Sequence, residues 1–175
     1  RCCSSAASDV YKRQEININL NNSTMYWLPK ELILFDNSKL RRNININLSG
    51  NSNLIFCETT IFGRKAMCEK IKNISFSDQW KIYSNFSIKH FEAINIKGST
   101  IDNFKNNYTF SNQSSLSTIL IFGDIVNQLE SVLRKVKKKL ENHFCEMTKF
   151  DDKIIIRCLA DDNYDLKKTL NIIMK

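Results

Sequence analysis

Hydrophobic and polar residues alternate strictly over residues 15–20, where Ile16, Ile18 and Leu20 would share one face of a strand. The alternation returns over residues 43–48. In both places it is followed by a polar turn and then by an aromatic and aliphatic run. These two copies predict successive sheet layers or stacked hairpins, with a plain β-meander as an equally weighted alternative.

Further strands are predicted at residues 24–28, 32–35, 53–62, 80–83, 86–91, 93–96, 117–122 and 153–160. Residues 98–116 are polar and irregular, which favours a surface loop. Apolar residues then recur every three or four positions from Ile125 to about His143, and again after Asp161 or Asp162, either of which could cap the last helix. The sequence therefore predicts a mainly β fold of wound or stacked, solenoid-like sheets. Two α-helices belong to a C-terminal β-α-β-β-α portion.

The first fourteen residues, RCCSSAASDVYKRQ, differ sharply in composition from the rest of the chain, with one Val and no Ile or Asn. They resemble translated sequencing adapter. We therefore expect a non-native leader over residues 1–14 and one domain over residues 15–175. The chain stops inside a helical pattern without a C-cap, so we also expect truncation at that end.

Composition narrows the possible functions. The hydrophobic content of 42% argues against wholesale disorder. There is no run of 18 apolar residues, as a membrane span needs, and no glycine-rich phosphate-binding motif among only four glycines. The net charge of +8 comes with an abundance of Asn, Ile and Lys, typical of an AT-rich genome, and this weakens any inference to nucleic acid.

Histidine and cysteine offer little catalytic chemistry. His90 and His143 are far apart and neither lies in an H-x-x-H motif, which argues against a hydrolytic zinc site or a histidine-based dyad. No C-x-x-C pair occurs, and we expect the cysteines after the leader to be reduced thiols. These are Cys57, Cys68, Cys145 and Cys158. The lysine cluster at residues 135–139 could face phosphates, although a solvated helix face is the simpler interpretation.

Four carboxylates lie in or beside predicted strands: Glu31, Asp36, Glu58 and Glu69. A buried carboxylate requires a partner. Arg41, Arg42 and Arg64 are available as ion-pair partners, and a metal ion is the alternative. Sequence spacing alone favours ion pairing.

The segments WLPKELILFD, KLRR, ETTIFGRKAMCE and FSDQWKI together resemble the urease accessory protein family UreD, called UreH in some bacteria. The matching positions include Trp27, Leu28, Pro29, Glu31, Phe35, Asp36, Arg41, Gly63, Arg64, Glu69 and Trp80. The ending IIIRCLADDNYDLKKTL is also similar to the close of the family. Cys68 stands where the family usually has glycine, and the N-terminal motifs of the family are absent. The resemblance thus implies a C-terminal two-thirds fragment.

The resemblance implies a bacterial, cytoplasmic accessory protein of nitrogen metabolism that is not an enzyme and holds no tightly bound cofactor. Such proteins bind apo-urease and UreF, which recruits the GTPase UreG, and the assembly inserts nickel into the urease active site. The resemblance does not imply that the protein binds a membrane or nucleic acid. The family fold is a wound stack of sheets with a couple of helices, in agreement with the strand pattern.

An ion path needs weak, exchangeable oxygen ligands, because tight sites do not release their metal. We therefore hypothesise that Glu31, Asp36, Glu58 and Glu69 include residues that line a nickel path or an interface. The alternative is that Glu58 and Glu69 pair with Arg42 or Arg64. Trp27, Phe35 and Trp80 are expected in the core.

Two other functions stay open at this point. One is a basic β-rich nucleic-acid-binding module, whose affinity would depend strongly on salt. The other is an enzyme of unknown type on a β scaffold, which would need a pocket with a nucleophile and a base in reach.

Overall fold

The computed structural model describes residues 11–64, 67, 69, 71–99, 110–140 and 144–174. The elements in chain order are β1 (Lys12–Asn21), β2 (Thr24–Trp27), β3 (Leu32–Leu34), β4 (Lys39–Ser49), β5 (Asn53–Phe62), β6 (Asn73–Ser84), β7 (Ser87–Ser99), β8 (Ser115–Phe122), α2 (Ile125–Lys139), β9 (Cys145–Lys149), β10 (Lys153–Ala160) and α3 (Asn163–Ile173). The predicted mainly β class is confirmed, as is the closing β8-α2-β9-β10-α3 order.

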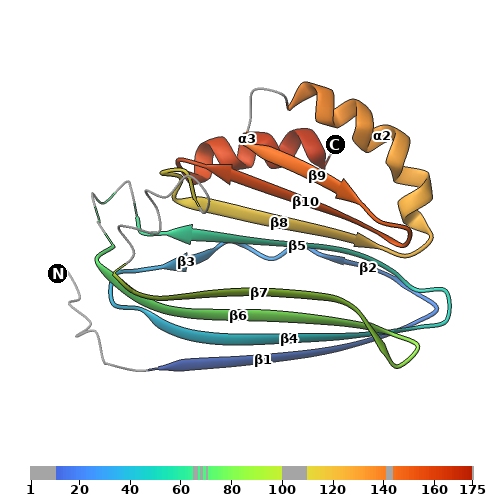
Figure 1. Ribbon diagram of the computed structural model, residues 1–175, viewed down its shortest axis with the longest axis horizontal. Coiled ribbons are helices and arrows are strands. Elements are labelled where there is room, and N and C mark those ends of the chain that lie inside the picture. The colour runs from blue at the N-terminus through green and yellow to red at the C-terminus, as the bar shows by residue number, and fades with distance from the viewer. Residues whose placement is uncertain are drawn as a thin grey trace.

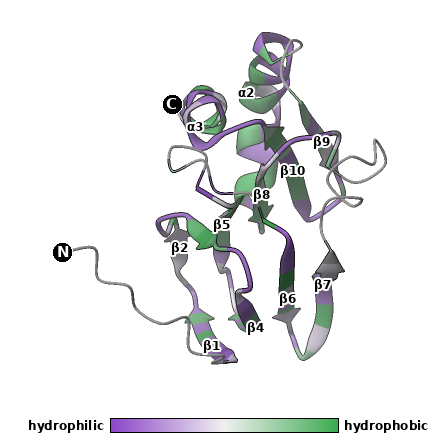
Figure 2. Cartoon of the chain, turned by 90° about the vertical axis from the view of Figure 1, so that its left-hand side faces the viewer, coloured by the Kyte–Doolittle hydropathy of each residue, from purple (hydrophilic) through white to green (hydrophobic). Residues whose placement is uncertain are grey.

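The strands form two sheets. The first is four-stranded, in the order β1-β4-β6-β7, and the second is six-stranded, in the order β2-β5-β8-β10-β9 with β3 also paired to β5. Helices α2 and α3 lie on the side of the six-stranded sheet that faces away from the four-stranded sheet (Figure 1). Viewed along the strands, the molecule has three layers: sheet, sheet and helices (Figure 2).

The repeated alternation forms neighbouring parallel strands. β1 pairs with β4 so that Ile16 lies beside Ile44, and Leu20 beside Leu48. The polar positions on the other face also meet, since the amide of Asn45 donates to Asn17 at 2.9 Å. The two copies therefore stack strand on strand in register, which a β-meander would not do.

Apolar residues fill both spaces between the layers. Between the sheets, the inward residues of β4, β5, β6, β8 and β10 pack together, with Phe56 fully buried at the centre. On the other face of the six-stranded sheet, Ile119, Ile154 and Ile156 pack against Val126 and Leu133 of α2. Strands β8 and β10 are thus covered on both faces, which explains their nearly continuous apolar sequences.

Several predictions need correction. The separate strands predicted at residues 86–91 and 93–96 belong to one strand, β7, and the strand predicted at 80–83 belongs to the longer β6. The solenoid-like description does not extend beyond the parallel pairs β1–β4, β4–β6, β2–β5 and β3–β5, because β7 and β8 pair antiparallel with β6 and β5. The strand predicted from residue 15 begins at Lys12. The predicted loop 98–116 is shorter than expected, because β7 extends to Ser99 and β8 begins at Ser115, and Phe110 between them is buried. The assignment of residues 1–14 to a foreign leader stays a prediction, and residues 1–10 lie outside the described residues.

The start of α3 follows a local sequence signal. The side chain of Asp162 accepts a hydrogen bond from the backbone N–H of Asp165, so the predicted cap of α3 is confirmed at Asp162.

Neither helix in the described part of the chain is long and apolar enough to cross a membrane.

Candidate functional site

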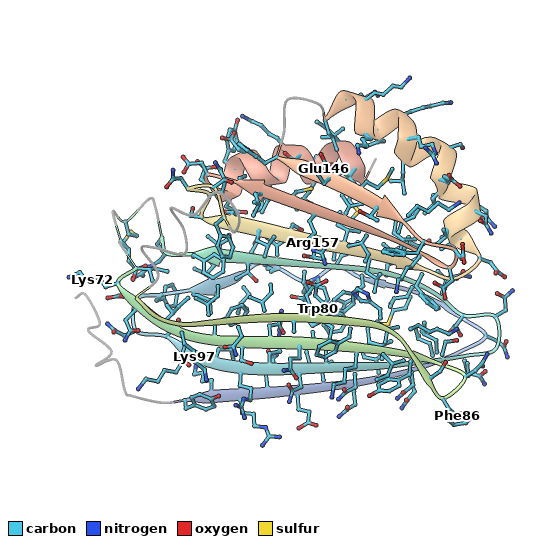
Figure 3. All side chains as sticks on the ribbon, in the orientation of Figure 1. Lys72, Trp80, Phe86, Lys97, Glu146 and Arg157 are labelled. Atoms are coloured by element: carbon cyan, nitrogen blue, oxygen red, sulfur yellow. The ribbon has the colours of Figure 1, made fainter. Side chains whose placement is uncertain are left out.

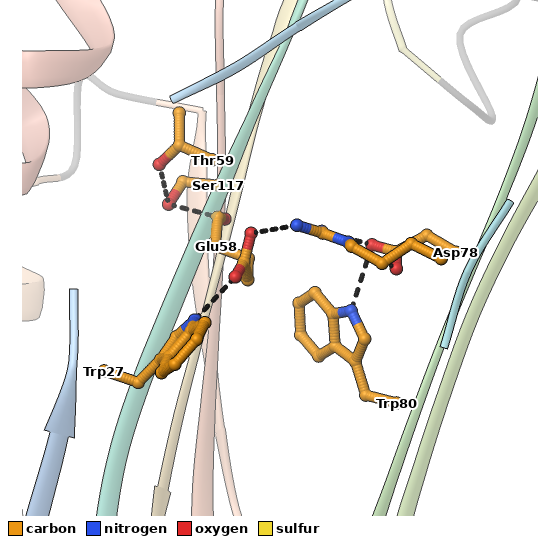
Figure 4. A network of polar contacts seen from close by, with 7 residues as sticks. Trp27, Glu58, Thr59, Asp78, Trp80 and Ser117 are labelled. Atoms are coloured by element: carbon orange, nitrogen blue, oxygen red, sulfur yellow. Dashed lines mark hydrogen bonds and ion pairs between the residues drawn. The ribbon is translucent and has the colours of Figure 1, made fainter. Parts of the chain in front are cut away.

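A chain of buried hydrogen bonds crosses the space between the two sheets (Figure 4). Arg42 of β4 donates from Nη1 to Oε2 of Glu58 on β5 at 2.7 Å, and from Nε and Nη2 to the carboxylate of Asp78 on β6 at 2.9 and 2.6 Å. The indole N–H of Trp27 donates to Glu58 at 2.6 Å, and that of Trp80 to Asp78 at 2.9 Å. These five residues are the inter-sheet network.

Burial makes the pairing within this network essential. The side chains of Arg42, Glu58 and Asp78 are only 6%, 3% and 2% exposed. A buried charge without a partner costs several kcal/mol, whereas here each charged group meets an opposite charge. Burial acts to lower the pKa of Arg42, but the hydrogen bonds and charges of Asp78 and Glu58 outweigh it and raise that pKa above its ordinary value. The guanidinium therefore stays charged and holds both carboxylates.

The two-residue period of the strands places these side chains inside. Arg42 continues the inward series that includes Ile44 on β4, and Asp78 lies between the inward residues Phe76 and Trp80 on β6. The parallel register then sets Arg42 beside Asp78. The same alternation that builds the apolar core thus delivers the charged residues to it.

The two tryptophans of the network enclose Phe56. The rings of Trp27 and Phe56 are stacked at 6.0 Å between centroids, and Trp80 meets Phe56 edge-on at 5.0 Å. Trp80 is 2% exposed, and Trp27 is partly buried against the main core. The predicted core placement of both tryptophans is confirmed, and Figure 3 shows Trp80 pointing into the space between the sheets.

A second group of motif residues lies where β3 and β5 end. The carboxylate of Glu69 accepts from the backbone N–H of Arg64 at 3.1 Å and from its Nε at 3.0 Å, and also from the backbone N–H of Asp36 at 3.4 Å. Asp36 in turn accepts from the backbone N–H groups of Lys72 and Asn73 at 2.7 and 3.0 Å. The group fastens the segment after β3 to the segment before β6.

Phe35 and Gly63 complete this second group. The guanidinium of Arg64 lies 4.6 Å from the centroid of the Phe35 ring, which is 43% exposed. The predicted core placement of Phe35 is wrong, because its ring packs under a cation at the surface. Gly63 has φ +82° and donates its N–H to the carbonyl of Leu34. Phe35, Asp36, Gly63, Arg64 and Glu69 are the terminal cluster.

Hydrogen bonds set the ionisation of the terminal cluster. The side chain of Arg64 lowers the pKa of Glu69, and the backbone N–H groups of Asn73 and Lys72 lower the pKa of Asp36. Both carboxylates are therefore ionised at neutral pH.

The remaining motif residues belong to neither group. Glu31 forms an ion pair with Lys167 of α3 at 2.7 Å, and this hydrogen bond lowers its pKa. Leu28 is 54% exposed and Pro29 beside it is also exposed, while Arg41 is exposed on β4. Leu28, Pro29 and Arg41 therefore lie at the surface and do not pack in the core.

The structure does not gather the four proposed nickel-path carboxylates. Asp36 and Glu69 lie together, Glu58 is buried between the sheets, and Glu31 contacts α3. Among the described residues, no group of three or more His, Cys, Asp or Glu side chains is arranged to hold a metal ion. The predicted alternative, ion pairing with arginine, is confirmed for both Glu58 and Glu69.

His90 is buried between the sheets, close to an ion pair. It is 7% exposed, with Nε2 3.7 Å from Oε2 of Glu92, too far for a hydrogen bond, while the same oxygen accepts from Nη2 of Arg157 of β10 at 2.5 Å. Arg157 and Glu92 therefore provide a second polar link between the sheets. His143 and Cys68 lie outside the described residues.

The basic face of α2 is partly neutralised. Arg134 pairs with Glu130 at 2.7 Å and Lys137 with Glu146 at 3.0 Å. These contacts are typical of a solvated helix face, and they give no support to the nucleic-acid alternative.

Comparison with known proteins adds a decisive observation to this geometry. A family model described as UreD urease accessory protein matches residues 2–175. This chain belongs to the UreD family. The UreD of Rhizobium rhizogenes strain K84 is 30% identical over 144 residues, covering 82% of this chain and 52% of that protein. The UreD of Agrobacterium fabrum strain C58 is 27% identical over 146 residues, covering 83% and 50%.

The chain thus spans about half the length of the curated relatives it matches, less than the two-thirds that the resemblance implied. A shorter match joins it to UreD 3 of Bradyrhizobium sp. strain BTAi1, at 34% identity over 102 residues, 54% of this chain and 37% of that protein. UreD proteins are accessory proteins, which agrees with the prediction that the chain is not an enzyme.

One central member of the inter-sheet network escaped the sequence analysis. Asp78 lies in the segment FSDQWKI that resembles the family, but it was not predicted as a partner for Arg42. Its place in the alternation of Phe76, Asp78 and Trp80 was the signal that could have revealed it.

Proposed function

We propose that this UreD-family chain acts in the cytoplasm as a scaffold in urease maturation. It binds apo-urease and UreF, and through UreF it joins the GTPase UreG. The observation that carries the proposal is the family match over residues 2–175. The Rhizobium and Agrobacterium relatives are both named urease accessory proteins, which supports the same role.

The geometry supports a scaffold. The inter-sheet network joins β4, β5 and β6 through one guanidinium, so the two sheets are held in a fixed register. Large apolar side chains meanwhile remain exposed along the edge formed by β2 and β3, including Tyr26 at 62% and Leu28 at 54%. Exposed aromatic and aliphatic side chains on a rigid frame suit protein–protein contact.

Nickel enters this proposal as cargo. We propose transient contact with the carboxylates of Asp36 and Glu69, because these two of the four candidates lie together and near the surface. Glu58 serves the inter-sheet network in this account, and Glu31 joins the β2–β3 connection to α3. Weak carboxylate contacts suit a cargo that must be released.

The nickel contact is tested by Asp36→Asn and Glu69→Gln in urease activation with purified partners. Nickel loading of urease is expected to fall in both variants while UreF binding persists. The control is Glu146→Gln, a carboxylate 82% exposed and outside both clusters. Unchanged loading in the two variants would remove Asp36 and Glu69 from the path.

The scaffold role is tested by co-purification of the tagged chain with UreF, followed by addition of UreG. Arg41→Met and Arg42→Met make a matched pair, since the two arginines are adjacent and only Arg42 lies in the inter-sheet network. The wild type and Arg41→Met are expected to retain UreF, and Arg42→Met to retain less of it because its fold is destabilised. A wild type that is folded and retains no UreF would contradict the proposal.

A further inference from the structure

Two cysteines face each other across the last antiparallel strand pair. Cys145, the first residue of β9, lies opposite Cys158 of β10, and their sulfur atoms are 2.6 Å apart. Both are free thiols in the structure, as is Cys57, in agreement with the sequence prediction for these three. The UreD role proposed above makes no use of any of them.

The register favours a covalent link between the pair. The backbone N–H of Leu159 donates to the carbonyl of Phe144 at 2.7 Å, and this bond flanks the Cys145–Cys158 position. The two cysteines thus occupy a non-hydrogen-bonded site of the antiparallel ladder, where facing Cα atoms are about 4.5 Å apart and side chains are closest. A disulfide accepts Cα separations of about 4.4–6.8 Å, so the backbone needs little change to close one.

The two thiols differ in access and in acidity. Cys158 is completely buried, whereas Cys145 is partly exposed, and both side chains pack on the helix-facing side of the six-stranded sheet, Cys145 near Leu133 and Val136 of α2. Arg157 and Glu146, the strand neighbours labelled in Figure 3, line an open cleft of about 680 Å³ on the other face, between the sheets. The hydrogen bond from Cys158 lowers the pKa of the Cys145 thiol and raises that of Cys158. Cys145 is thus the thiol placed to react first, and Cys158 the thiol placed to follow.

We propose that Cys145 and Cys158 form a thiol–disulfide exchange site that takes a small-molecule disulfide and closes to a cross-strand disulfide. The Cys145 thiolate attacks one sulfur of the small disulfide, which forms a mixed disulfide and releases one thiolate. The Cys158 thiol then attacks the Cys145 sulfur and passes its proton to the second small thiolate, which leaves as a thiol. Two protein thiols are oxidised to one disulfide, and the small disulfide is reduced to two thiols after protonation. The product ties the edge strand β9 to β10.

Oxidised glutathione is the probe. The folded full chain is incubated with it, quenched with acid and digested with trypsin, which places Cys145 in the peptide Leu140–Lys149 and Cys158 in Cys158–Lys167. The expected main product is these two peptides joined by a disulfide that dithiothreitol reverses. Cys57 is the internal control, because burial raises the pKa of its thiol and it lies on a third peptide. Its modification is expected to be at least about tenfold slower.

The variant Cys158→Ser isolates the first step. It is expected to accumulate the glutathione adduct at Cys145, since no second thiol can displace glutathione. In the wild type the same adduct should pass on to the linked peptides. An adduct that persists on wild-type Cys145, a disulfide that joins either cysteine to a different one, or modification of Cys145 no faster than that of Cys57 would overturn the proposal. The wild-type digest decides the matter alone if the variant does not fold.

Discussion

Replacing Arg42 by methionine removes the one cation of the inter-sheet network and keeps much of the side-chain volume. The substitution leaves the carboxylates of Glu58 and Asp78, which are 3% and 2% exposed, without their ionic partner. Each then keeps one indole hydrogen bond, from Trp27 and Trp80 respectively.

The expected cost follows from these contacts. Breaking a buried ion pair by removing one partner typically costs about 3–5 kcal/mol. Arg42 serves two carboxylates, so we expect the free energy of unfolding to fall by at least that amount. Domains of this size have about 5–15 kcal/mol in total, so the substitution should remove a large share of the stability. Arg41→Met changes an exposed side chain on the adjacent residue and should cost less than about 0.5 kcal/mol.

Urea unfolding, followed by far-UV circular dichroism, measures the difference. Tryptophan fluorescence provides a second probe, since both tryptophans of the chain belong to the network. With a slope of about 2 kcal/mol per molar urea, the midpoint of Arg42→Met should fall by about 2 M. Adding Glu58→Gln and Asp78→Asn to this variant should recover part of the loss, because no charge then remains buried.

An unfolding free energy of Arg42→Met within about 1 kcal/mol of the wild type would refute this reasoning. It would mean that water reaches the two carboxylates, and that the sheets are held together by apolar packing alone. A triple variant no more stable than Arg42→Met would show that lost packing, and not charge, sets the cost.

Three smaller effects are expected. Gly63→Ala should lower the unfolding free energy by about 1–3 kcal/mol, because φ is +82° there and an added Cβ would lie 3.3 Å from Ile71. Asp162→Ala should lower it by about 1 kcal/mol in the same urea assay, because α3 loses its N-cap. The folded-state pKa values of Asp36 and Glu69 lie below their ordinary 3.8 and 4.5, so the unfolded chain binds more protons as the pH falls. The two carboxylates therefore contribute fully to the free energy of unfolding above about pH 4.5, and this contribution is lost as the pH drops through their lower folded-state pKa values. In the double variant Asp36→Asn with Glu69→Gln, the free energy of unfolding should fall less steeply over this pH range.

Local pattern was sufficient to predict most strands and both helices. The strict alternation around Ile16 and Ile44 gave the inward faces, and the spacing between the copies matched the parallel register of β1 and β4. The antiparallel return of β7 and β8 was not predictable in this way, because pairing direction depends on which strands meet after the chain has turned. The solenoid expectation failed for that reason.

Some contacts of the candidate site were also predictable from local sequence, whereas others depended on the fold. Arginine partners for Glu58 and Glu69 were expected from sequence alone, because a carboxylate among apolar residues needs a cation. The grouping of Arg42 with both Glu58 and Asp78 was missed, since it requires the sheets to face one another. Phe35 was misplaced because an aromatic in an apolar run is usually buried, and only the fold shows Arg64 above its ring.

The most direct test of the scaffold role is the binding of the purified chain to UreF, measured by size-exclusion chromatography at micromolar concentration with circular dichroism as a check of folding. One complex of chain and UreF is expected, which then takes up UreG and elutes earlier. A folded chain that elutes alone at every ratio of UreF would contradict it.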